Sequence, residues 1–437
     1  MDATHQTPHQ QGEEHEQDDL PQLTEDDVEE IHNDGDEDGE GQGDEPMSEG
    51  EDGDDDDKVV LHDSSISAFY GSKGESIFTI SLHPNYPSTP LAVSGGSDDR
   101  AFVWRVAENG ECEVVQQLEP SHKDSVTMVS WSSDGSLLAT GGMDGLIHVF
   151  SCSSPSTFAH LTTLEGGDEV QFLLFHPKGP VLAAGYADST VWMWSLPAAT
   201  LMNVFTGHEE GVTAGRFTPD GKRLLTTSTD GSLLIYDPRQ ATPLAKLGKG
   251  DARFGGIEGG FISLACSPDN RLAAVGSVTG QSRLVSLTGV EQGRGMAVVA
   301  ALEGHTPGES IEGLAFVSLL GDPSSASHLI TAGTDGRAIV WDLQTQRVRQ
   351  TCLHVDSPDS NEAGALTTLV VHGSGPLFTT ASSGGTLRTW DARSGATVAK
   401  HEGFVDGVLD ADVRPNGKGG WTVVGAGDEG VALVFSC

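Results

Sequence analysis

From about residue 62 onward, short stretches of alternating apolar and polar residues follow one another, separated by turns rich in Gly, Asp and Ser. A typical unit begins with an apolar strand at 126–131 and a turn at 133–136. A small, apolar strand at 137–142 comes next, then an Asp-Gly turn and a third strand at 146–150. A looser fourth strand completes the unit. Because alternation with period two places one face of a strand in a core, the pattern predicts an all-β fold of four-stranded units.

The unit recurs eight times. In each copy the third strand closes six positions after the first turn residue, and the closing residues are Trp104, Phe150, Trp194, Tyr236, Val285, Trp341, Trp390 and Phe435. The 331 residues from the first to the last divide into seven intervals of about 47, close to the repeat length of propeller blades. The fifth copy is irregular, with Thr279 and Val285 in place of Asp and Trp, and its role stays open.

The two ends of the repeat array are expected to meet. The sequence stops at Cys437, directly after the third strand of the eighth unit, and an apolar segment at 66–70 precedes the first unit. This segment is predicted to supply the missing fourth strand, since closing the ring removes exposed strand edges. Residues 58–437 are therefore predicted to form one eight-bladed β-propeller.

The negative charge is concentrated at the N-terminus. Residues 1–57 hold 25 of the 65 Asp and Glu residues and no Lys or Arg, within a formal net charge of −41. Such composition predicts a disordered acidic tail, in which phosphorylation at Ser48 would add little to the existing charge. The rest of the chain is also acidic, with 40 acids against 24 bases. An acidic surface argues against direct nucleic-acid binding and favours a basic protein partner.

Cysteine usage and the N-terminus bear on the compartment. The five cysteines are scattered without a CxxC pair, and the N-terminus is polar and acidic rather than a signal peptide. These features predict a reducing compartment, the cytoplasm or also the nucleus. No apolar run approaches the ~18 residues of a membrane helix, and we expect neither metal nor cofactor.

Several strings of the sequence resemble a known family. Gly-His and Trp-Asp pairs at this spacing resemble WD40 repeats. More specific strings at 95–104, 122–127, 310–313 and 426–435 resemble the angio-associated migratory cell protein and its fungal counterpart, the SQT-type ribosome-assembly chaperone. The acidic N-terminal extension also suits that family, so the expected fold is an eight-bladed WD40 β-propeller with an acidic tail.

Some side chains look catalytic at first sight. His305, Thr334 and Asp335 resemble a hydrolase triad, and the arrangement recurs two blades earlier as His208, Ser228 and Asp230. Because such groups recur from blade to blade and none stands out beside an oxyanion hole, we predict no enzymatic activity. The resemblance to WD40 folds implies a buried hydrogen-bond network instead, formed by His208, Asp230, His305, Asp335 and Trp341.

The register of the repeat identifies a candidate binding face. The first strand of each unit begins with an apolar key residue, for example Val126. In WD40 blades, the residues on either side of this key residue lie on the top face, near the central channel. The candidate residues for client-peptide binding at this face are Glu75, Phe78, Asp99, Asp124, Glu169, Glu258, Phe261, Glu309, Glu312 and Asp428. Lys123 is the nearest base. Carboxylates that pair with guanidinium groups, beside apolar spots that hold side-chain stems, predict binding of an Arg/Lys-rich peptide.

The resemblance implies a function. Fungal members escort a newly made large-subunit ribosomal protein of the L-sixteen class, L-ten in eukaryotic naming, and hold its basic N-terminus until delivery to the pre-60S ribosome. It also marks Asp124, Glu169, Phe261, Glu312 and Asp428 as the matching positions. We expect a monomer that contacts no membrane. An acidic histone chaperone and a signalling scaffold stay as alternatives, and the sequence does not identify the client, its release trigger or the role of the tail.

Overall fold

The computed structural model describes residues 62–72, 74–254, 257, 259–322, 324–355 and 363–437. Within these residues the chain is built from 33 strands and one short 3-10 helix, which confirms the all-β prediction. The predicted tail at 1–57, Ser48 within it and the boundary at residue 58 lie outside the described residues.

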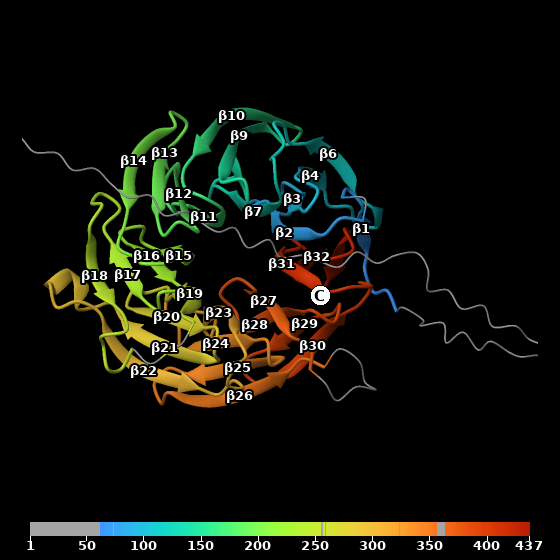
Figure 1. Ribbon diagram of the computed structural model, residues 1–437. Coiled ribbons are helices and arrows are strands. Elements are labelled where there is room, and N and C mark those ends of the chain that lie inside the picture. The colour runs from blue at the N-terminus through green and yellow to red at the C-terminus, as the bar shows by residue number, and fades with distance from the viewer. Residues whose placement is uncertain (1–61, 73, 255–256, 258, 323, 356–362) are drawn as a thin grey trace, which may run out of the picture. The chain divides into compact units, whose positions relative to one another are not determined.

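Eight separate sheets are arranged in a ring, and one edge strand of each sheet lies innermost (Figure 1). The prediction of an eight-bladed β-propeller is therefore confirmed. Blade 1 comprises β2 (Ile77–Leu82), β3 (Leu91–Gly96), β4 (Ala101–Arg105) and β6 (Glu113–Gln117); blade 2 comprises β7 (Val126–Trp131), β8 (Leu137–Gly142), β9 (Leu146–Ser154) and β10 (Thr157–Glu165); blade 3 comprises β11 (Val170–Phe175), β12 (Val181–Tyr186), β13 (Val191–Ser195) and β14 (Thr200–Phe205); blade 4 comprises β15 (Val212–Phe217), β16 (Leu224–Ser228), β17 (Leu233–Tyr236) and β18 (Pro243–Leu247).

The second half of the ring follows the same plan. Blade 5 comprises β19 (Phe261–Cys266), β20 (Leu272–Ser277), β21 (Gln281–Ser286) and β22 (Ala297–Glu303), with the helix η1 (Val290–Gln292) before β22; blade 6 comprises β23 (Ile311–Val317), β24 (His328–Gly333), β25 (Arg337–Asp342) and β26 (Arg347–Leu353); blade 7 comprises β27 (Leu366–Val371), β28 (Leu377–Ser382), β29 (Leu387–Asp391) and β30 (Ala396–His401); blade 8 comprises β31 (Val408–Pro415), β32 (Trp421–Gly427), β33 (Ala432–Ser436), β1 (Ser67–Phe69) and β5 (Gly110–Glu111).

The ring closes as the sequence predicts. Strand β1 pairs antiparallel with β33, with Ala68 opposite Leu433, so the N-terminal segment completes blade 8. The sequence did not indicate β5, which pairs parallel with β1 and covers its outer edge. Two carboxylates strengthen the seam from the inner strand: Asp410 accepts a hydrogen bond of 3.0 Å from the amide of Ile80, and Asp412 accepts one of 2.9 Å from Leu82. Burial raises the pKa of Asp410 to about 7, although hydrogen bonds from the amides of Ile80 and Ala411 oppose the shift.

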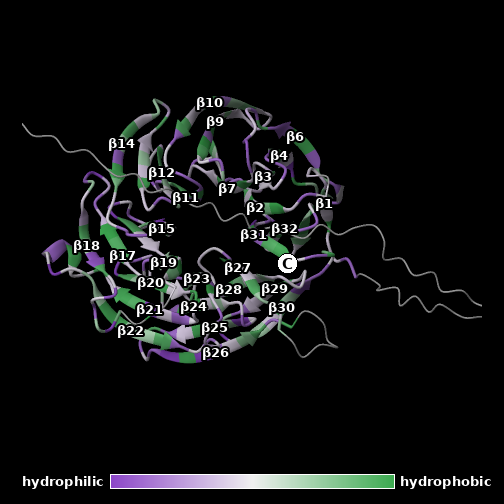
Figure 2. Ribbon diagram, in the orientation of Figure 1, coloured by the Kyte–Doolittle hydropathy of each residue, from purple (hydrophilic) through white to green (hydrophobic). Residues whose placement is uncertain are grey.

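The hydrophobic core lies between neighbouring blades. Figure 2 shows hydrophobic colour concentrated on the middle strands and hydrophilic colour on outer strands such as β6, β18 and β26. All eight closing residues are buried, each between 0% and 4% exposed. The second strands use small residues because the next blade approaches closely: a Cβ on Gly141 would lie 2.9 Å from a methyl group of Val170. Apolar alternation and small residues therefore determine how adjacent sheets pack.

Candidate functional site

Every inner strand begins at the same end of the ring, which we call the top face; the opposite end, where the inner strands finish, is the bottom face. Hydroxyl groups just inside the top face link consecutive blades. Thr213 donates a hydrogen bond of 2.6 Å to the carbonyl of Phe261, and Thr367 donates one of 2.6 Å to the carbonyl of Val408. These hydroxyls satisfy backbone acceptors across the blade boundary, which fixes the spacing of the inner strands around the channel.

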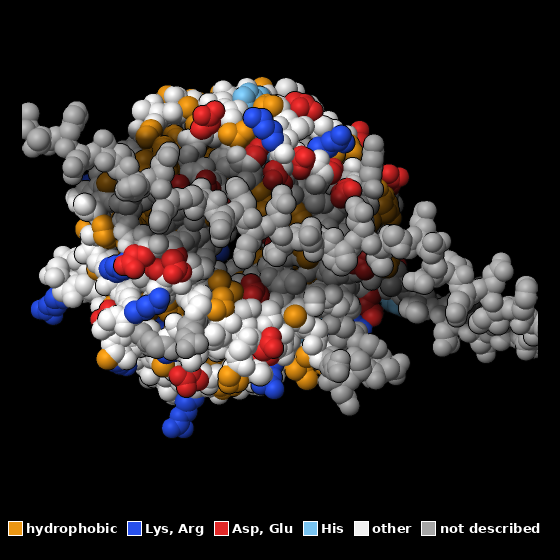
Figure 3. Space-filling view, in the orientation of Figure 1, with side chains coloured by type: hydrophobic (Ala, Val, Ile, Leu, Met, Phe, Trp, Pro, Cys, Tyr) orange, Lys and Arg blue, Asp and Glu red, His pale blue; other side chains and the backbone are white. Residues whose placement is uncertain are grey.

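The acidic candidates surround this rigid frame and reach solvent. The exposed carboxylates are Glu75, Asp124, Glu169, Glu309, Glu312 and Asp428, whereas Asp99 is half-buried. None of them forms an ion pair with a Lys or Arg side chain in the described part of the chain. Figure 3 shows one face of the ring, on which both carboxylates and Lys and Arg side chains reach the surface. Unpaired, solvated carboxylates are suited to bind a cationic ligand without first breaking internal ion pairs.

Hydroxyl groups position some of these carboxylates. Ser310 donates to Glu312 through its hydroxyl, and its backbone N–H donates to the Thr334 hydroxyl at 2.9 Å. Thr334 in turn donates to Glu309 at 2.7 Å. The two glutamates of blade 6 are thus joined by one hydrogen-bonded chain. The sequence did not indicate that Ser310 and Thr334 orient these acids.

A second supported carboxylate lies at the closure of the ring. Ser76 at the start of blade 1 donates a hydrogen bond of 2.6 Å to Asp428 of blade 8. Next to it, Ser97 donates to Glu75 at 3.3 Å. Asp428 and Glu75, which are 353 positions apart in the sequence, therefore belong to one acidic region across the seam.

The apolar candidates behave differently from one another. Phe78 is half-buried, as is Ile262, and Met143 is 40% exposed. Phe261 is a correction: its side chain is 0% exposed and packs on Phe254 with ring centroids 4.9 Å apart, so it belongs to the core and offers no surface to a peptide. Phe261 is the first residue of the inner strand β19, and it is buried. Glu258 lies outside the described residues.

The residues that resemble a triad form a buried hydrogen-bond network instead. In blade 6, His305 Nδ1 lies 2.9 Å from Asp335, His305 Nε2 lies 2.7 Å from Thr331, and the indole of Trp341 donates to Thr331 at 3.0 Å. Burial opposes ionisation of Asp335, but hydrogen bonds from His305 and from the Thr306 amide outweigh it and lower the pKa. A fully satisfied buried network of this kind ties the loop to the blade.

Blade 4 contains a variant of the same chain. His208 contacts Thr226 at 2.7 Å and Ser232 at 2.9 Å, while Asp230 accepts a hydrogen bond from the amide of Glu209 at 2.8 Å. Ser228, which the sequence grouped with His208, donates to the carbonyl of Glu210 instead.

The threonine that accepts the hydrogen bond from the closing tryptophan was not predicted, although the sequence contains a signal for it. Thr331 precedes Trp341 by ten positions, and Thr380 precedes Trp390 by the same interval and accepts its indole N–H at 2.9 Å. In blade 1, Ser94 accepts from Trp104 at 3.3 Å. A Ser or Thr ten residues before the closing Trp therefore identifies the acceptor.

Across the described residues, no group of three or more His, Cys, Asp and Glu side chains is placed to hold a metal ion. None of the helical segments described is long and apolar enough to cross a membrane.

The closed ring of four-stranded blades and the His–Asp–Thr–Trp chain define a WD40 β-propeller protein. In agreement, the family model described as "WD domain, G-beta repeat" matches residues 112–151, 158–195 and 199–237. The human angio-associated migratory cell protein is 35% identical over 342 residues, which cover 77% of this chain and 72% of that protein. The chain belongs to the angio-associated migratory cell protein family.

Fungal proteins extend the likeness over more of the chain. An uncharacterized WD repeat-containing protein of Schizosaccharomyces pombe is 31% identical over 421 residues, covering 95% of this chain and 97% of the relative. Among solved structures, Sqt1 of Chaetomium thermophilum bound to the N-terminus of the ribosomal protein L10 is similar, with a TM-score of 0.75 and 27% sequence identity. That likeness covers 86% of this chain and all of the Sqt1 chain.

Proposed function

We propose that this protein is a ribosome-assembly chaperone whose top face binds the basic N-terminal segment of a large-subunit ribosomal protein of the L10 type. The observation that carries the proposal is the structural likeness to Sqt1 in complex with the N-terminus of L10. The acidic top face supports it independently, because six exposed carboxylates there are free of Lys and Arg partners among the described residues.

The proposed mechanism is electrostatic capture on a preformed surface. The hydrogen-bonded pair Glu309 and Glu312 presents two carboxylates to one guanidinium or ammonium group. Asp124 and Glu169 offer further partners on blades 2 and 3, and the half-buried Phe78 offers apolar contact to a side-chain stem. Capture would shield the client's cations from nonspecific contacts with RNA until competing charges on the pre-60S particle release it. The chain acts in this proposal as a monomeric scaffold in the cytoplasm, with no catalytic step.

Charge reversal at one top-face residue tests the proposal. Glu312→Lys should weaken binding of a synthetic L10-type N-terminal peptide about tenfold or more, because it replaces an attraction with a repulsion and each tenfold corresponds to about 1.4 kcal/mol. Fluorescence anisotropy at two salt concentrations measures this, and the wild-type affinity should fall with salt since exposed charges are screened.

The matched control is Glu113→Lys, on the outer strand β6, where the side chain is 75% exposed. It makes the same change in net charge at a distance from the top face and should leave the affinity within about twofold of wild type. Equal binding by the Glu312→Lys variant and the wild type would show that the assigned face is wrong. Equal binding of a core-histone tail peptide would instead favour a general histone-type chaperone over a dedicated one.

A further inference from the structure

A cavity of about 480 Å³ opens between blades 3 and 4 on the bottom face, away from the acidic candidates. Its apolar lining consists of Val181, Met193, Met202 and Pro238. Met193 is fully buried and forms part of the core, whereas Met202 on β14 is 43% exposed. A volume of this size lies within the range of ligand sites in proteins, and flexible methionine side chains adapt to different apolar groups.

The walls of this cavity are held by contacts between the two blades. His176 after β11 donates a hydrogen bond of 2.9 Å from Nε2 to the carbonyl of Gly221 in the turn of blade 4. Gly221 adopts φ +73°, and a Cβ there would lie 2.4 Å from the imidazole of His176. On the other side, Asn203 donates a hydrogen bond of 2.6 Å to the carbonyl of Pro238. The cavity is therefore a built feature of the blade boundary.

The polar rim of the cavity is basic, in contrast to the net charge of the protein. Lys222, Arg223 and Arg239 line it beside one carboxylate, Asp237. Asp237 is already engaged: Arg239 donates to it from Nε at 3.0 Å and from a terminal nitrogen at 2.8 Å, and Arg223 lies 3.8 Å away. The side chains of Arg239 and Lys222 are still 82% and 68% exposed, so their outward N–H groups face solvent.

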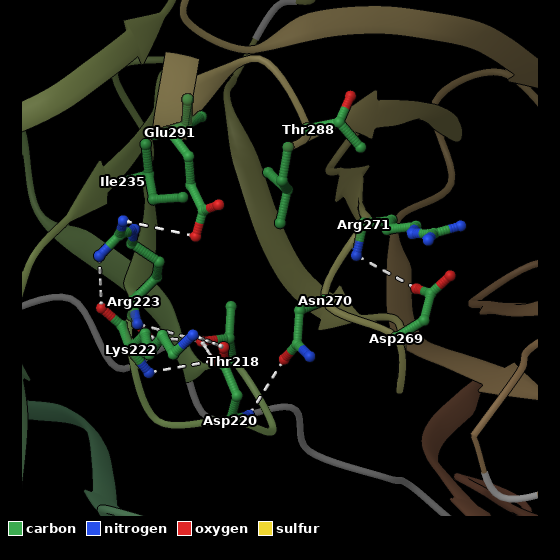
Figure 4. A pocket seen from close by; sticks show the side chains of 12 residues that line it. Thr218, Asp220, Lys222, Arg223, Ile235, Asp269, Asn270, Arg271, Thr288 and Glu291 are labelled. Atoms are coloured by element: carbon green, nitrogen blue, oxygen red, sulfur yellow. Dashed lines mark hydrogen bonds and ion pairs between the residues drawn. The ribbon is translucent and has the colours of Figure 1, made fainter. Parts of the chain in front are cut away.

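A smaller neighbouring cavity of about 280 Å³ shares Lys222 and Arg223 and is shown in Figure 4. Arg223 extends there toward Glu291, 3.8 Å away, and Arg271 lies across the cavity near Thr288. Ile235, Leu287 and Val290 add apolar lining. The turn at 218–223 places Lys222 and Arg223 between two hollows that are partly apolar, and within the turn Asp220 lies 3.7 Å from Lys222.

We propose that the bottom face at blades 3 and 4 binds an acidic peptide segment of a partner protein, with one apolar side chain inserted against Met193 and Met202. Carboxylates beside this anchor pair with the outward edges of Arg239 and Lys222. The chemistry is opposite to that of the top face, so the two faces bind ligands of opposite charge. A partner bound here leaves the top face free, which allows the protein to hold a basic client and an acidic partner together.

The test is selection from a phage library of random peptides about a dozen residues long, displayed to the full-length protein. Enriched peptides should combine Asp or Glu with a Leu, Ile, Met or Phe anchor, and they should bind the Glu312→Lys variant as tightly as wild type. Arg239→Glu should weaken these peptides about tenfold or more, a free-energy loss of about 1.4 kcal/mol per tenfold. Met202→Asp should weaken them comparably, and replacing the peptide's apolar anchor by Ser should do the same.

Arg239 is highly exposed, so its variant is expected to keep the fold, and an unchanged melting temperature verifies this for both variants. Basic peptides that bind the top face provide a further control, since they should be unaffected by either bottom-face change. The proposal is overturned if no acidic class is enriched, or if the enriched acidic peptides bind the Arg239→Glu variant as well as wild type. It is also overturned if a short RNA binds this face with a dependence on Arg239 but none on Met202.

Discussion

Blades 5 and 6 stand next to each other in the ring and are stabilised in different ways. In blade 6, the loop before the inner strand supplies His305, which contacts Asp335 and Thr331 and, through Thr331, Trp341. In blade 5, the corresponding loop supplies Phe254, which packs with Phe261 and Val285 in one apolar cluster. Thr279 takes the place of the turn aspartate and contacts Ser277 at 3.1 Å.

The difference explains why the fifth repeat looks irregular in sequence. A buried imidazole needs partners for both nitrogens, so a histidine in this loop requires polar side chains beside it. His305 contacts Asp335 and Thr331, whereas His208 of blade 4 contacts Ser232 and Thr226. A phenyl ring needs no partner, so once the loop carries Phe254 the closing residue can be Val285. The two blades share the same geometry, which either a packed apolar cluster or a polar hydrogen-bond network can stabilise.

The largest effect is expected from truncating the aromatic ring of Phe261 in the apolar cluster of blade 5. Phe261→Ala should lower the free energy of unfolding by about 3–5 kcal/mol, since it leaves a cavity in a fully buried cluster. Urea unfolding followed by tryptophan fluorescence measures the loss, and Phe261→Leu should lose much less. A decrease in the free energy of unfolding below about 1 kcal/mol, together with weaker peptide binding, would show that Phe261 belongs to the binding surface rather than to the core.

Breaking the network of blade 6 should cost somewhat less. His305→Ala is expected to lower the free energy of unfolding by about 2–3 kcal/mol, because it leaves Asp335 and Thr331 buried with fewer partners. Combining it with Trp341→Phe gives a double-mutant cycle. A coupling energy near zero would mean that the two residues act separately and that the chain through Thr331 carries no energy.

Acidification distinguishes the two blades further. The pKa of Asp335 is lowered in the folded state, so its contribution to stability is present above the ordinary pKa of an aspartate and is lost as the pH falls through the folded value. The stability difference between wild type and Asp335→Asn should therefore be full at neutral pH and shrink in acid. Thermal unfolding of both proteins across this range measures it. A difference that stays constant into strong acid would contradict the lowered pKa.

The smallest effect is expected where blade 5 is given the residue typical of its neighbour. Thr279→Asp should change stability by no more than about 0.5 kcal/mol, because the loop before this blade carries Phe254 and offers no imidazole to the new carboxylate. The converse change, Asp335→Thr, should be clearly destabilising. A clear gain in stability from Thr279→Asp would show that blade 5 has an unused polar partner.

The repeat pattern was sufficient to predict the number of blades and their closure. Alternation and the six-residue interval between turn and closing residue located all eight third strands, and the apolar segment at 66–70 indicated the strand that completes blade 8. It could not predict β5, because a two-residue parallel pairing has no periodicity of its own. The burial of Phe261 could not be predicted either. Alternation shows that one face of a strand is buried, but it does not show whether the first residue of the strand lies on that face.

The sequence by itself determined the class of fold and the acidic balance, because these follow from local periodicity and counting. The tertiary structure decided which side chains meet. It joined Asp428 to Ser76 across the closure and Glu309 to Glu312 through Ser310 and Thr334. It also brought Lys222, Arg239 and Met202 together around one cavity. Contacts between separate repeats depend on how the blades pack, and packing is a property of the closed ring.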